Sequence, residues 1–283
     1  MDALETFANA IDEEDSRIDL ARACLLLAED AYPALDVEGY VGELERHARG
    51  LRARLGVDIA PEEKVVALNE FLFDDLGYSG NTRDYYDPRN SYLNEVIDRR
   101  TGIPITLAVL YMEIGRRIGL PVEGVSFPGH FLVRLQVRGG TLVLDPFSGG
   151  MPQSGEELRE RLKRLIPPGA AGRVPVEQLA LDSFLEPAGK RQILARLLRN
   201  LKAIYRENNQ PERLLEVLNR MIIVAPDSSA DLRDRGLVYQ QLECWRPALQ
   251  DLRDYLAREP GAPDAEEIRA SAMELTRRCA RLS

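Results

Sequence analysis

The feature that most constrains the fold is a change of hydrophobic periodicity in the middle of the chain. Residues 104–118 carry apolar side chains around most of a helical circumference, which predicts a central, buried helix. Beyond Gly119 the pattern alternates in "HFLVRLQVR", reaches Gly139-Gly140, and alternates again in "TLVLDPF". Alternating apolar residues around a glycine pair predict a β-hairpin. The sequence therefore predicts an α+β domain with helices around a small antiparallel sheet.

The segments before this helix are predicted to be helical as well. Both "EDSRIDLARACLLLAEDAY" and "DVEGYVGELERHARGLRARLG" place apolar residues at helical spacing. Another helix is predicted from Pro61, which suits a first helical turn, to Gly77, which suits a C-terminal cap. Together with the hairpin, these helices define an N-terminal domain, residues 1–186, that ends within "FLEPAGK".

The C-terminal part of the chain repeats with a period of 34 residues. The matching positions are Leu198 with Leu232, Tyr205 with Tyr239, Leu218 with Leu252, Met221 with Tyr255, and Pro226 with Pro260. The prolines fall in phase and end each second helix, because proline cannot continue a helix. The segment resembles the tetratricopeptide-repeat family over residues 195–228 and 229–262, with a capping helix at 264–281. The resemblance implies an all-α domain, residues 187–283.

The repeats leave two interpretations open. Repeat stacks form extended concave surfaces, so this domain is expected to offer a groove to a protein or peptide partner. The other interpretation is that two units only brace the core, because about three repeats are normally needed for stability.

Composition weighs against several functions. The formal net charge is −9 without a long basic block, which makes nucleic-acid binding unlikely on physical grounds. The basic segment "RERLKRL", residues 159–165, is interpreted as a solvated helix face. The chain shows neither an apolar run long enough for a membrane span nor a signal-peptide pattern, so we expect a cytoplasmic protein. Three scattered cysteines and two histidines predict no metal site, and no cofactor is expected.

Residues 79–102 form a polar segment rich in turn-forming residues, tyrosine and arginine. So many hydrogen-bonding groups in a loop are typical of a binding surface. They are equally typical of a loop tied down by its own Asp and Asn contacts. We expect residues 79–91 to form the rim of a cleft whose lining includes Tyr92, Asn94 and Glu95.

The order of elements around His130 is the one that a papain-like acyl-transfer site needs. Such a site places a cysteine at a helix N-terminus, a histidine on a strand, and an Asp or Asn on the next strand. The stretches "YYDPRNSYLNEVIDRRTGIPITLAVLYMEIGRRIGLPVEGVSFPGHFLVR" and "LVLDPFSGG" resemble the transglutaminase-like superfamily. Within it they resemble the bacterial Sir-B-type proteins, which join such a core to tetratricopeptide repeats. With the repeats, the resemblance covers nearly the whole chain.

The resemblance implies a catalytic histidine at His130 and an orienting aspartate at Asp145. It places the family cysteine, two residues after a glycine at the helix start, on Pro104, which follows Gly102. Proline preserves the helix start but supplies no nucleophile. Thr106 is close in sequence, but a hydroxyl needs activation by a base within hydrogen-bond reach. Pro104 and Thr106 are therefore assigned to the lining of the cleft.

The remaining thiols are interpreted as structural. Cys24 lies on the apolar face of a predicted helix, where a buried thiol is inert. Cys244 and Cys279 belong to the repeat domain.

The geometry of the predicted hairpin leaves the partner of Asp145 open. With Gly139-Gly140 as a two-residue turn, Asp145 faces Arg134 and His130 lies about 13 Å farther along. That geometry predicts a cross-strand ion pair between Arg134 and Asp145. The resemblance instead favours a bulge that brings Asp145 to His130.

The favoured hypothesis is a non-catalytic binding or scaffold protein with a degenerate transglutaminase-like cleft and a protein-interaction module. The alternative is an amide- or acyl-transfer hydrolase of the cysteine-protease or transglutaminase type, using His130 and Asp145 with a displaced nucleophile. A third possibility is acid–base chemistry by His130 and Asp145 without a covalent step.

Overall fold

The computed structural model describes residues 2–165 and 180–281. The contacts that residues make divide the chain into two compact units, described separately here. The core unit comprises residues 13–165 and 180–193, and the repeat unit comprises residues 2–12 and 194–281. The domain boundary inferred from the sequence, between residues 186 and 187, remains a proposal. Within the described residues, every helix is too short or too polar to span a membrane.

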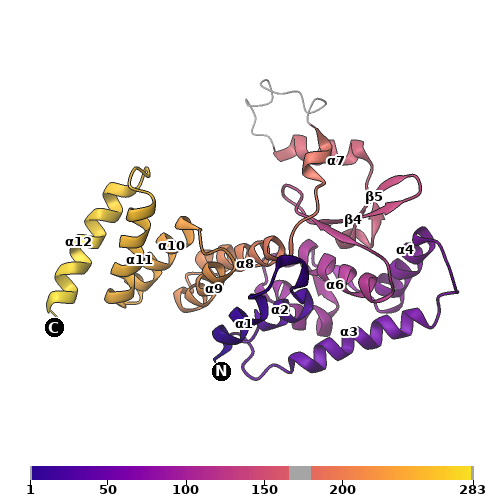
Figure 1. Cartoon of the computed structure of the whole chain (residues 1–283), viewed down its shortest axis with the longest axis horizontal. Coiled ribbons are helices and arrows are strands. Elements are labelled where there is room, and N and C mark those ends of the chain that lie inside the picture. Colours follow the sequence, from indigo (N-terminus) through magenta and orange to yellow (C-terminus); the bar gives the residue numbers. More distant parts are fainter. Residues whose placement is uncertain (1, 166–179, 282–283) are drawn as a thin grey trace. The chain divides into compact units, whose positions relative to one another are not determined.

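The core unit combines helices with two small sheets (Figure 1). Its α-helices are α2 (Leu20–Leu26), α3 (Val37–Arg52), α4 (Pro61–Asn69), α5 (Leu93–Arg99), α6 (Pro104–Arg117) and α7 (Gly155–Leu165). A π-helical turn follows α4 at Glu70–Asp75. Single 3-10 turns lie at Asp15–Arg17, Pro88–Ser91, Pro146–Ser148 and Leu181–Phe184.

The main sheet of the core unit is antiparallel, with strands in the order β3-β4-β5-β6. Its strands are β3 (Glu123–Val125), β4 (Leu132–Val137), β5 (Gly140–Asp145) and β6 (Met151–Pro152). A second, two-residue ladder pairs β1 (Ser79–Gly80) with β2 (Thr101–Gly102) in parallel. This is the helix-rich α+β architecture that the change of periodicity predicted.

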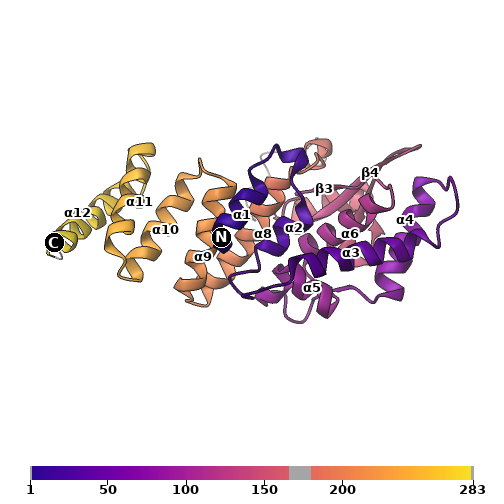
Figure 2. The same ribbon diagram turned by 60° about the horizontal axis from the view of Figure 1, so that its bottom comes forward.

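Helix α6 is the centre of the core unit. All residues from Pro104 to Gly115 are buried, which explains why apolar side chains occupy most of its circumference. The helix lies between α3 and the sheet, and α7 lies on the far face of the sheet (Figures 1 and 2). Helix α7 packs there through Leu158 and Leu162, which join an apolar cluster with Val125, Phe127, Leu132 and Val143.

The hairpin forms where the sequence predicted it, but with a different register. Val137 pairs with Gly140, so the turn is made by Arg138 and Gly139 instead of the glycine pair. Arg134 consequently lies opposite Val143, two residues from the predicted register.

The side chain of Arg134 does not pair with Asp145, the partner that the predicted register placed opposite it. It pairs with Glu123 on β3 at 3.0 Å and donates a hydrogen bond to the carbonyl of Leu185 at 2.7 Å. The predicted ion pair between Arg134 and Asp145 is therefore wrong.

The repeat unit is entirely helical in its described residues. It contains α1 (Ala3–Ile11), the part of α8 (Lys190–Glu207) from residue 194 on, α9 (Pro211–Val224), α10 (Ser229–Gln241), α11 (Trp245–Arg258) and α12 (Ala265–Arg281). Helices α8 to α11 form the two predicted helix pairs, and α12 caps the stack as expected. Gly236 permits close packing of α10 on α11, since a Cβ atom there would lie 2.7 Å from Leu252.

The N-terminal helix α1 adds to this stack. Its Phe7 is fully buried, and the guanidinium of Arg220 on α9 lies 5.6 Å from the centre of the Phe7 ring. Residues 2–12 therefore pack with the repeats, although they are separated from them by the whole core unit in the sequence.

Candidate functional site

Asp145 is the centre of the candidate site, and it is fully buried at the end of β5. Its Oδ1 lies 2.9 Å from Nε2 of His130 and accepts the backbone N–H of Phe147 at 3.1 Å. Its Oδ2 accepts hydrogen bonds from the guanidinium of Arg161 at 2.9 Å and from the hydroxyl of Ser148 at 3.1 Å. A buried carboxylate with this set of partners is held in one orientation.

A tight turn before β4 brings His130 to Asp145. Gly129 adopts a φ of 68°, in the left-handed region that favours glycine, and the N–H of His130 donates to the carbonyl of Phe127 at 3.1 Å. Proximity of His130 to Asp145, which the family resemblance favoured, is confirmed. It arises from the register of the hairpin and this turn, and not from the bulge that the resemblance favoured.

Arg161 belongs to the site, although the sequence did not suggest it. The basic segment of residues 159–165 was interpreted as a solvated face, and for Arg161 this is wrong. Its side chain is 30% exposed and its guanidinium pairs with Asp145. Helix α7 turns this side chain toward the sheet because Leu158 and Leu162 bury the same face of the helix. Its spacing of three residues from the buried Leu158 was the available signal.

The charge of Asp145 is stabilised by its neighbours. Burial by itself raises the pKa of a carboxyl group, because it disfavours the charged form. The hydrogen bond and charge of His130, followed by the charge of Arg161, outweigh burial and hold the pKa of Asp145 below its ordinary value. Asp145 is thus an anion that orients His130 through Nε2.

This pKa shift predicts that acid weakens the core unit. A carboxyl whose pKa is lower in the folded state adds stability above its unfolded pKa of about 3.9, and loses it as the pH falls further. We expect the stability difference between wild type and Asp145→Asn to shrink as the pH falls below about 4. Urea unfolding of both proteins at pH 6, 4 and 3 measures it. A difference that grows in acid contradicts the assignment.

Pro104 occupies the first turn of α6, where the resemblance placed the family cysteine. It is buried and sits at the first helical position, which proline suits because its missing N–H has no partner there. The neighbouring Thr106 hydroxyl is buried and lies 2.8 Å from the carbonyl of Asn90, while it accepts the N–H of Ile103 at 3.1 Å. Thr106 therefore holds the helix start in place, and its hydroxyl is committed to the backbone.

Gly102 explains how closely the chain packs at this helix start. A Cβ atom there would lie 2.7 Å from Oγ1 of Thr106 and 3.1 Å from the side chain of Val96. At Gly102, β2 therefore packs closely against α5 and the first turn of α6. The glycine of the family motif is explained by packing, whether or not chemistry takes place beside it.

The three polar residues assigned to the cleft are positioned by local structure. Tyr92 is buried and packs edge-on against the ring of Tyr32 at 5.6 Å. Asn94 is also buried, and Glu95 pairs with Arg99 at 3.9 Å. Their place in a cleft remains a proposal.

Aromatic side chains lie next to His130, and the sequence analysis did not single them out. The ring of Phe147 is 6.0 Å from that of His130, and the ring of Tyr85 is 6.2 Å from that of Phe147. Tyr86 follows at 5.3 Å from Tyr85 and is 68% exposed. Gly80 allows this arrangement, because a Cβ atom there would lie 2.6 Å from the Phe147 ring.

The polar loop is tied down by asparagines, as one of the two interpretations predicted. The Nδ2 of Asn90 donates to the carbonyl of Asp84 at 2.7 Å, and that of Asn81 donates to Oδ1 of Asn90 at 3.1 Å. The same loop carries Tyr85 and Tyr86 to the aromatic cluster beside His130. The loop is therefore held by its own hydrogen bonds and also presents Tyr85 and Tyr86 beside the site, so the two interpretations of the loop are compatible.

The cysteines are placed as follows. Cys24 is buried in α2, where burial raises the pKa of its thiol well above the ordinary value, with the charge of Glu113 adding to it. The charge that acts on Cys24 is thus not at the Pro104 end of α6, because Glu113 lies nine residues after Pro104, about 13 Å along the helix. Cys244 is exposed and Cys279 is partly exposed, and both lie in the repeat unit. In the described residues, no group of three or more His, Cys, Asp or Glu side chains could hold a metal.

The fold and the His130–Asp145 pair define a transglutaminase-like core joined to helical repeats. Residues 38–199 match the Transglutaminase-like superfamily, and residues 201–273 match the Tetratricopeptide repeat family. The chain belongs to the transglutaminase-like superfamily and, within it, to the UPF0162 family, which confirms the resemblance seen in the sequence.

Relatives match over most of their length. A UPF0162 protein of Xylella fastidiosa strain 9a5c is 44% identical over 93% of this chain and 92% of its own. A UPF0162 protein of Pseudomonas aeruginosa is 31% identical over 82% of each chain. Protein SirB1 of Salmonella typhimurium is 28% identical over 81% of this chain and 82% of its own.

Proposed function

We propose that this protein is a non-catalytic binding or scaffold protein, in which the transglutaminase-like core recognises a protein or peptide without covalent chemistry. The observation that carries the proposal is Pro104 at the first position of α6. A helix N-terminus is where a thiolate is stabilised in a papain-like site, and proline has neither a thiol nor a hydroxyl. The neighbouring Thr106 hydroxyl is engaged with the backbone of Asn90 and Ile103.

Exposed apolar side chains near His130 support recognition of a partner. Eight large apolar residues are exposed in the described part of the chain, and four of them lie on segments that contact the site. They are Tyr85, Tyr86, Met151 and Leu165. Met151 pairs with Asp145 across the sheet, and Leu165 lies 3.1 Å from a Cβ atom built on Gly129. Clustered exposed apolar residues are typical of interaction sites.

The repeat unit supports a second recognition surface. Tetratricopeptide repeats generally mediate protein–protein interaction, and this unit contains a cavity of about 350 Å³. Its lining includes Arg206, Arg233 and Leu237, whose side chain is 39% exposed. Arg206 pairs with Asp234 and Arg233 pairs with Asp264, and both carboxylates belong to the same lining. The feature that supports peptide binding is therefore Leu237, as a contact for an apolar anchor.

An assay for turnover tests the proposal directly. We expect the purified protein not to accelerate the hydrolysis of p-nitrophenyl esters or peptide amides. We also expect it not to accelerate acyl transfer to a primary amine. Turnover that His130→Ala abolishes would contradict the proposal and support the hydrolase alternative. A variant with Cys24→Ala, Cys244→Ser and Cys279→Ser then decides whether a thiol takes part.

Binding is tested with peptides selected on the intact protein from a random peptide library. We expect Tyr86→Ala and Met151→Ser to weaken the selected peptides about tenfold or more, as replacement of an anchor residue does. Met273→Ser is the matched control, because Met273 is equally exposed at 60% but lies in the repeat unit. Peptides that bind all of these variants equally would show that the surface beside His130 is not a recognition site.

The hydrolase alternative rests on one observation, the preserved His130–Asp145 pair. Asp145 engages Nε2 of His130, so Nδ1 is the ring nitrogen that would take a proton from a nucleophile. The same pair is the basis for acid–base chemistry without a covalent step, in which His130 exchanges a proton with the substrate directly. Both alternatives predict turnover that depends on His130, whereas the binding proposal does not.

A further inference from the structure

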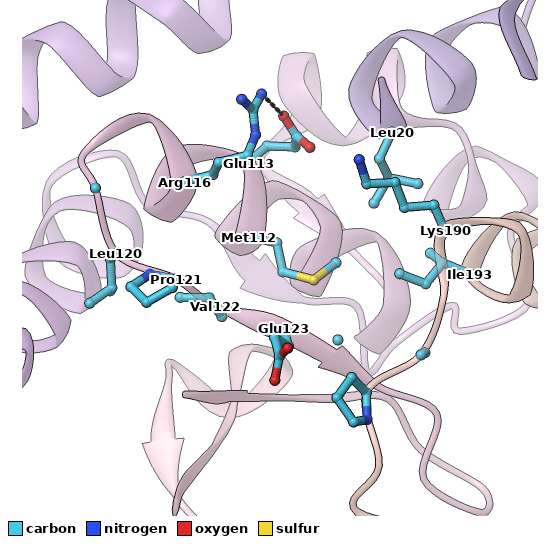
Figure 3. Close-up of a pocket in the computed structure, with 14 residues that line it drawn as sticks. Leu20, Met112, Glu113, Arg116, Leu120, Pro121, Val122, Glu123, Lys190 and Ile193 are labelled. Atoms are coloured by element: carbon cyan, nitrogen blue, oxygen red, sulfur yellow. Dashed lines mark hydrogen bonds and ion pairs between the residues drawn. The ribbon is translucent and has the colours of Figure 1, made fainter. Parts of the chain in front are cut away.

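The core unit contains a cavity of about 620 Å³, whose residues are not part of the His130 site. Its walls are the second half of α6, the segment from Gly119 to Gly124, the segment from Pro187 to Ile193, and Leu20 at the start of α2. Figure 3 shows Met112 in the middle of these residues, surrounded by Leu20, Ile193, Leu120 and Val122. The volume lies within the range of small-molecule sites, about 300–1,000 Å³.

The walls of this cavity are fixed by backbone contacts. The N–H of Ala188 donates to the carbonyl of Gly124 at 2.8 Å, and Pro187 forms a β-bridge with Val125. The backbone N–H of Lys190 donates to Asp15 at 2.8 Å. The cavity is therefore bounded by hydrogen-bonded segments that hold its shape before a ligand arrives.

The carboxylates on the lining are already neutralised. Glu113 is buried and accepts hydrogen bonds from Arg116, at 3.0 Å, and from Arg117. Figure 3 marks the contact of Glu113 with Arg116 at one end of the cavity. Glu123, at the opposite end in that view, pairs with Arg134 at 3.0 Å. Neither carboxylate is left to attract a cationic ligand.

Lys190 is the cation on the lining that lacks a carboxylate. Its ammonium donates to the carbonyls of Ser16 at 2.7 Å and Ile18 at 2.6 Å, and within residues 2–165 and 180–281 it forms no ion pair. An ammonium has three N–H donors, so one of them can be given to a ligand. In Figure 3 its side chain extends toward the end of the cavity that holds Glu113 and Arg116. Arg116 lies at the same end with its side chain 61% exposed; it gives one N–H to Glu113, and its guanidinium has further N–H donors for a ligand.

We propose that this cavity binds an amphipathic anion, a molecule with an apolar chain or ring and a single carboxylate. The apolar part occupies the space around Met112, whose flexible thioether adapts to irregular shapes. The carboxylate accepts hydrogen bonds from Lys190 and Arg116, which makes these contacts charge-assisted. The site is distinct from the surface beside His130, and it does not depend on the function proposed for that surface.

Methyl NMR of the intact protein tests this proposal with dodecanoate as the probe. The chain has five methionines, and 13C-methyl labelling gives each a separate signal that a Met→Leu variant assigns. Met112 reports on the cavity, Met151 on the surface beside His130, and Met273 on the exposed repeat unit. We expect dodecanoate, below its micelle concentration, to shift the Met112 signal saturably while the signals of Met151 and Met273 stay in place.

Two comparisons establish that the charge matters. Dodecanol and dodecyltrimethylammonium have the same chain with no charge or a positive charge, and each is expected to bind at least about tenfold more weakly than dodecanoate. Lys190→Gln is expected to weaken dodecanoate by about tenfold and to leave dodecanol unchanged. Lys163→Gln removes an equal charge from α7, outside the cavity, and serves as the control.

A filling variant tests the location separately. Ala188→Trp places a large ring in the cavity and is expected to abolish the Met112 shift; the spectrum of the free variant shows whether it has folded. The proposal is overturned if the Met112 signal does not move in wild type. It is also overturned if all exposed methionines shift together, which is surfactant adsorption, or if dodecanol binds as tightly as dodecanoate.

Discussion

Replacing Asp145 by alanine is expected to destabilise the core unit by about 3–5 kcal/mol, the usual cost of removing one partner from a buried ion pair. His130, with its side chain 14% exposed, loses its carboxylate, and the partly buried Arg161 loses the carboxylate with which it pairs. The N–H of Phe147 and the hydroxyl of Ser148 lose their acceptor as well.

Hydrogen exchange of the amides in β4 and β5 measures this effect locally, because it reports the free energy of opening at each strand. Asp75→Ala is the matched control. Asp75 also pairs with an arginine, Arg54, but both side chains are largely exposed, at 45% and 59%. An exposed pair contributes about 0–1 kcal/mol. Equal effects of the two substitutions would show that burial of Asp145 does not strengthen its contacts.

Leu252→Ala is expected to destabilise the repeat unit by about 3 kcal/mol, within the range for a buried leucine. Leu252 is fully buried in the apolar cluster between α10, α11 and α12, and it packs against Gly236. The substitution leaves a cavity that the neighbouring helices fill only in part. In a repeat array each unit contacts only its neighbours, so the loss is concentrated there.

Tryptophan fluorescence reports this prediction, because Trp245 on α11 is the single tryptophan of the chain. The guanidinium of Arg278 on α12 lies 4.7 Å from its ring, so separation of these helices changes its environment. Urea unfolding followed at Trp245 is expected to shift to lower urea for Leu252→Ala. Leu237→Ala is the control, because its side chain is 39% exposed and its loss is expected to cost under about 1 kcal/mol. Equal shifts for both variants would contradict the packing argument.

The elements of the fold were predictable because their signals are local. The apolar circumference of residues 104–118 specified α6 to within a residue. The prolines spaced by 34 residues marked the ends of two helix pairs in the repeat unit. Ser154 and Glu157 have the spacing of a capping box in the sequence, and the N–H of Ser154 donates to Glu157 at 2.7 Å at the start of α7.

The candidate site was predictable only in part. His130 and Asp145 were found through resemblance to a family motif, and their ring-to-carboxylate contact is now observed at 2.9 Å. Arg161 was missed because basic residues on an amphipathic helix usually face solvent. Phe147 was missed, and Tyr85 and Tyr86 were included only as part of the expected rim, residues 79–91. Their proximity to His130 depends on a close approach at Gly80, which has no sequence period.

The hairpin shows most clearly where local information ends. Side chains alternate between the faces of a strand with a period of two, so a one-residue slip reverses the faces and is excluded by the hydrophobic pattern. The predicted and observed registers differ by two residues, which leaves every side chain on the same face. The pattern cannot distinguish these registers, and only the packing of the sheet and the turn at Gly129 place His130 beside Asp145.

Helix α5 and strands β1 and β2 lie in the segment 79–102, which the sequence analysis treated as a loop. By itself, the sequence determined the central helix, the strands of the hairpin, the period of the repeats, and the proline at the position of the family nucleophile. These follow from short-range periodicity and residue chemistry, which act along the chain. The tertiary structure alone decided that Asp145 joins His130 to Arg161, and that Lys190 reaches the apolar cavity lined by Met112. Those contacts join segments far apart in sequence, and they depend on how buried faces pack together rather than on any local pattern.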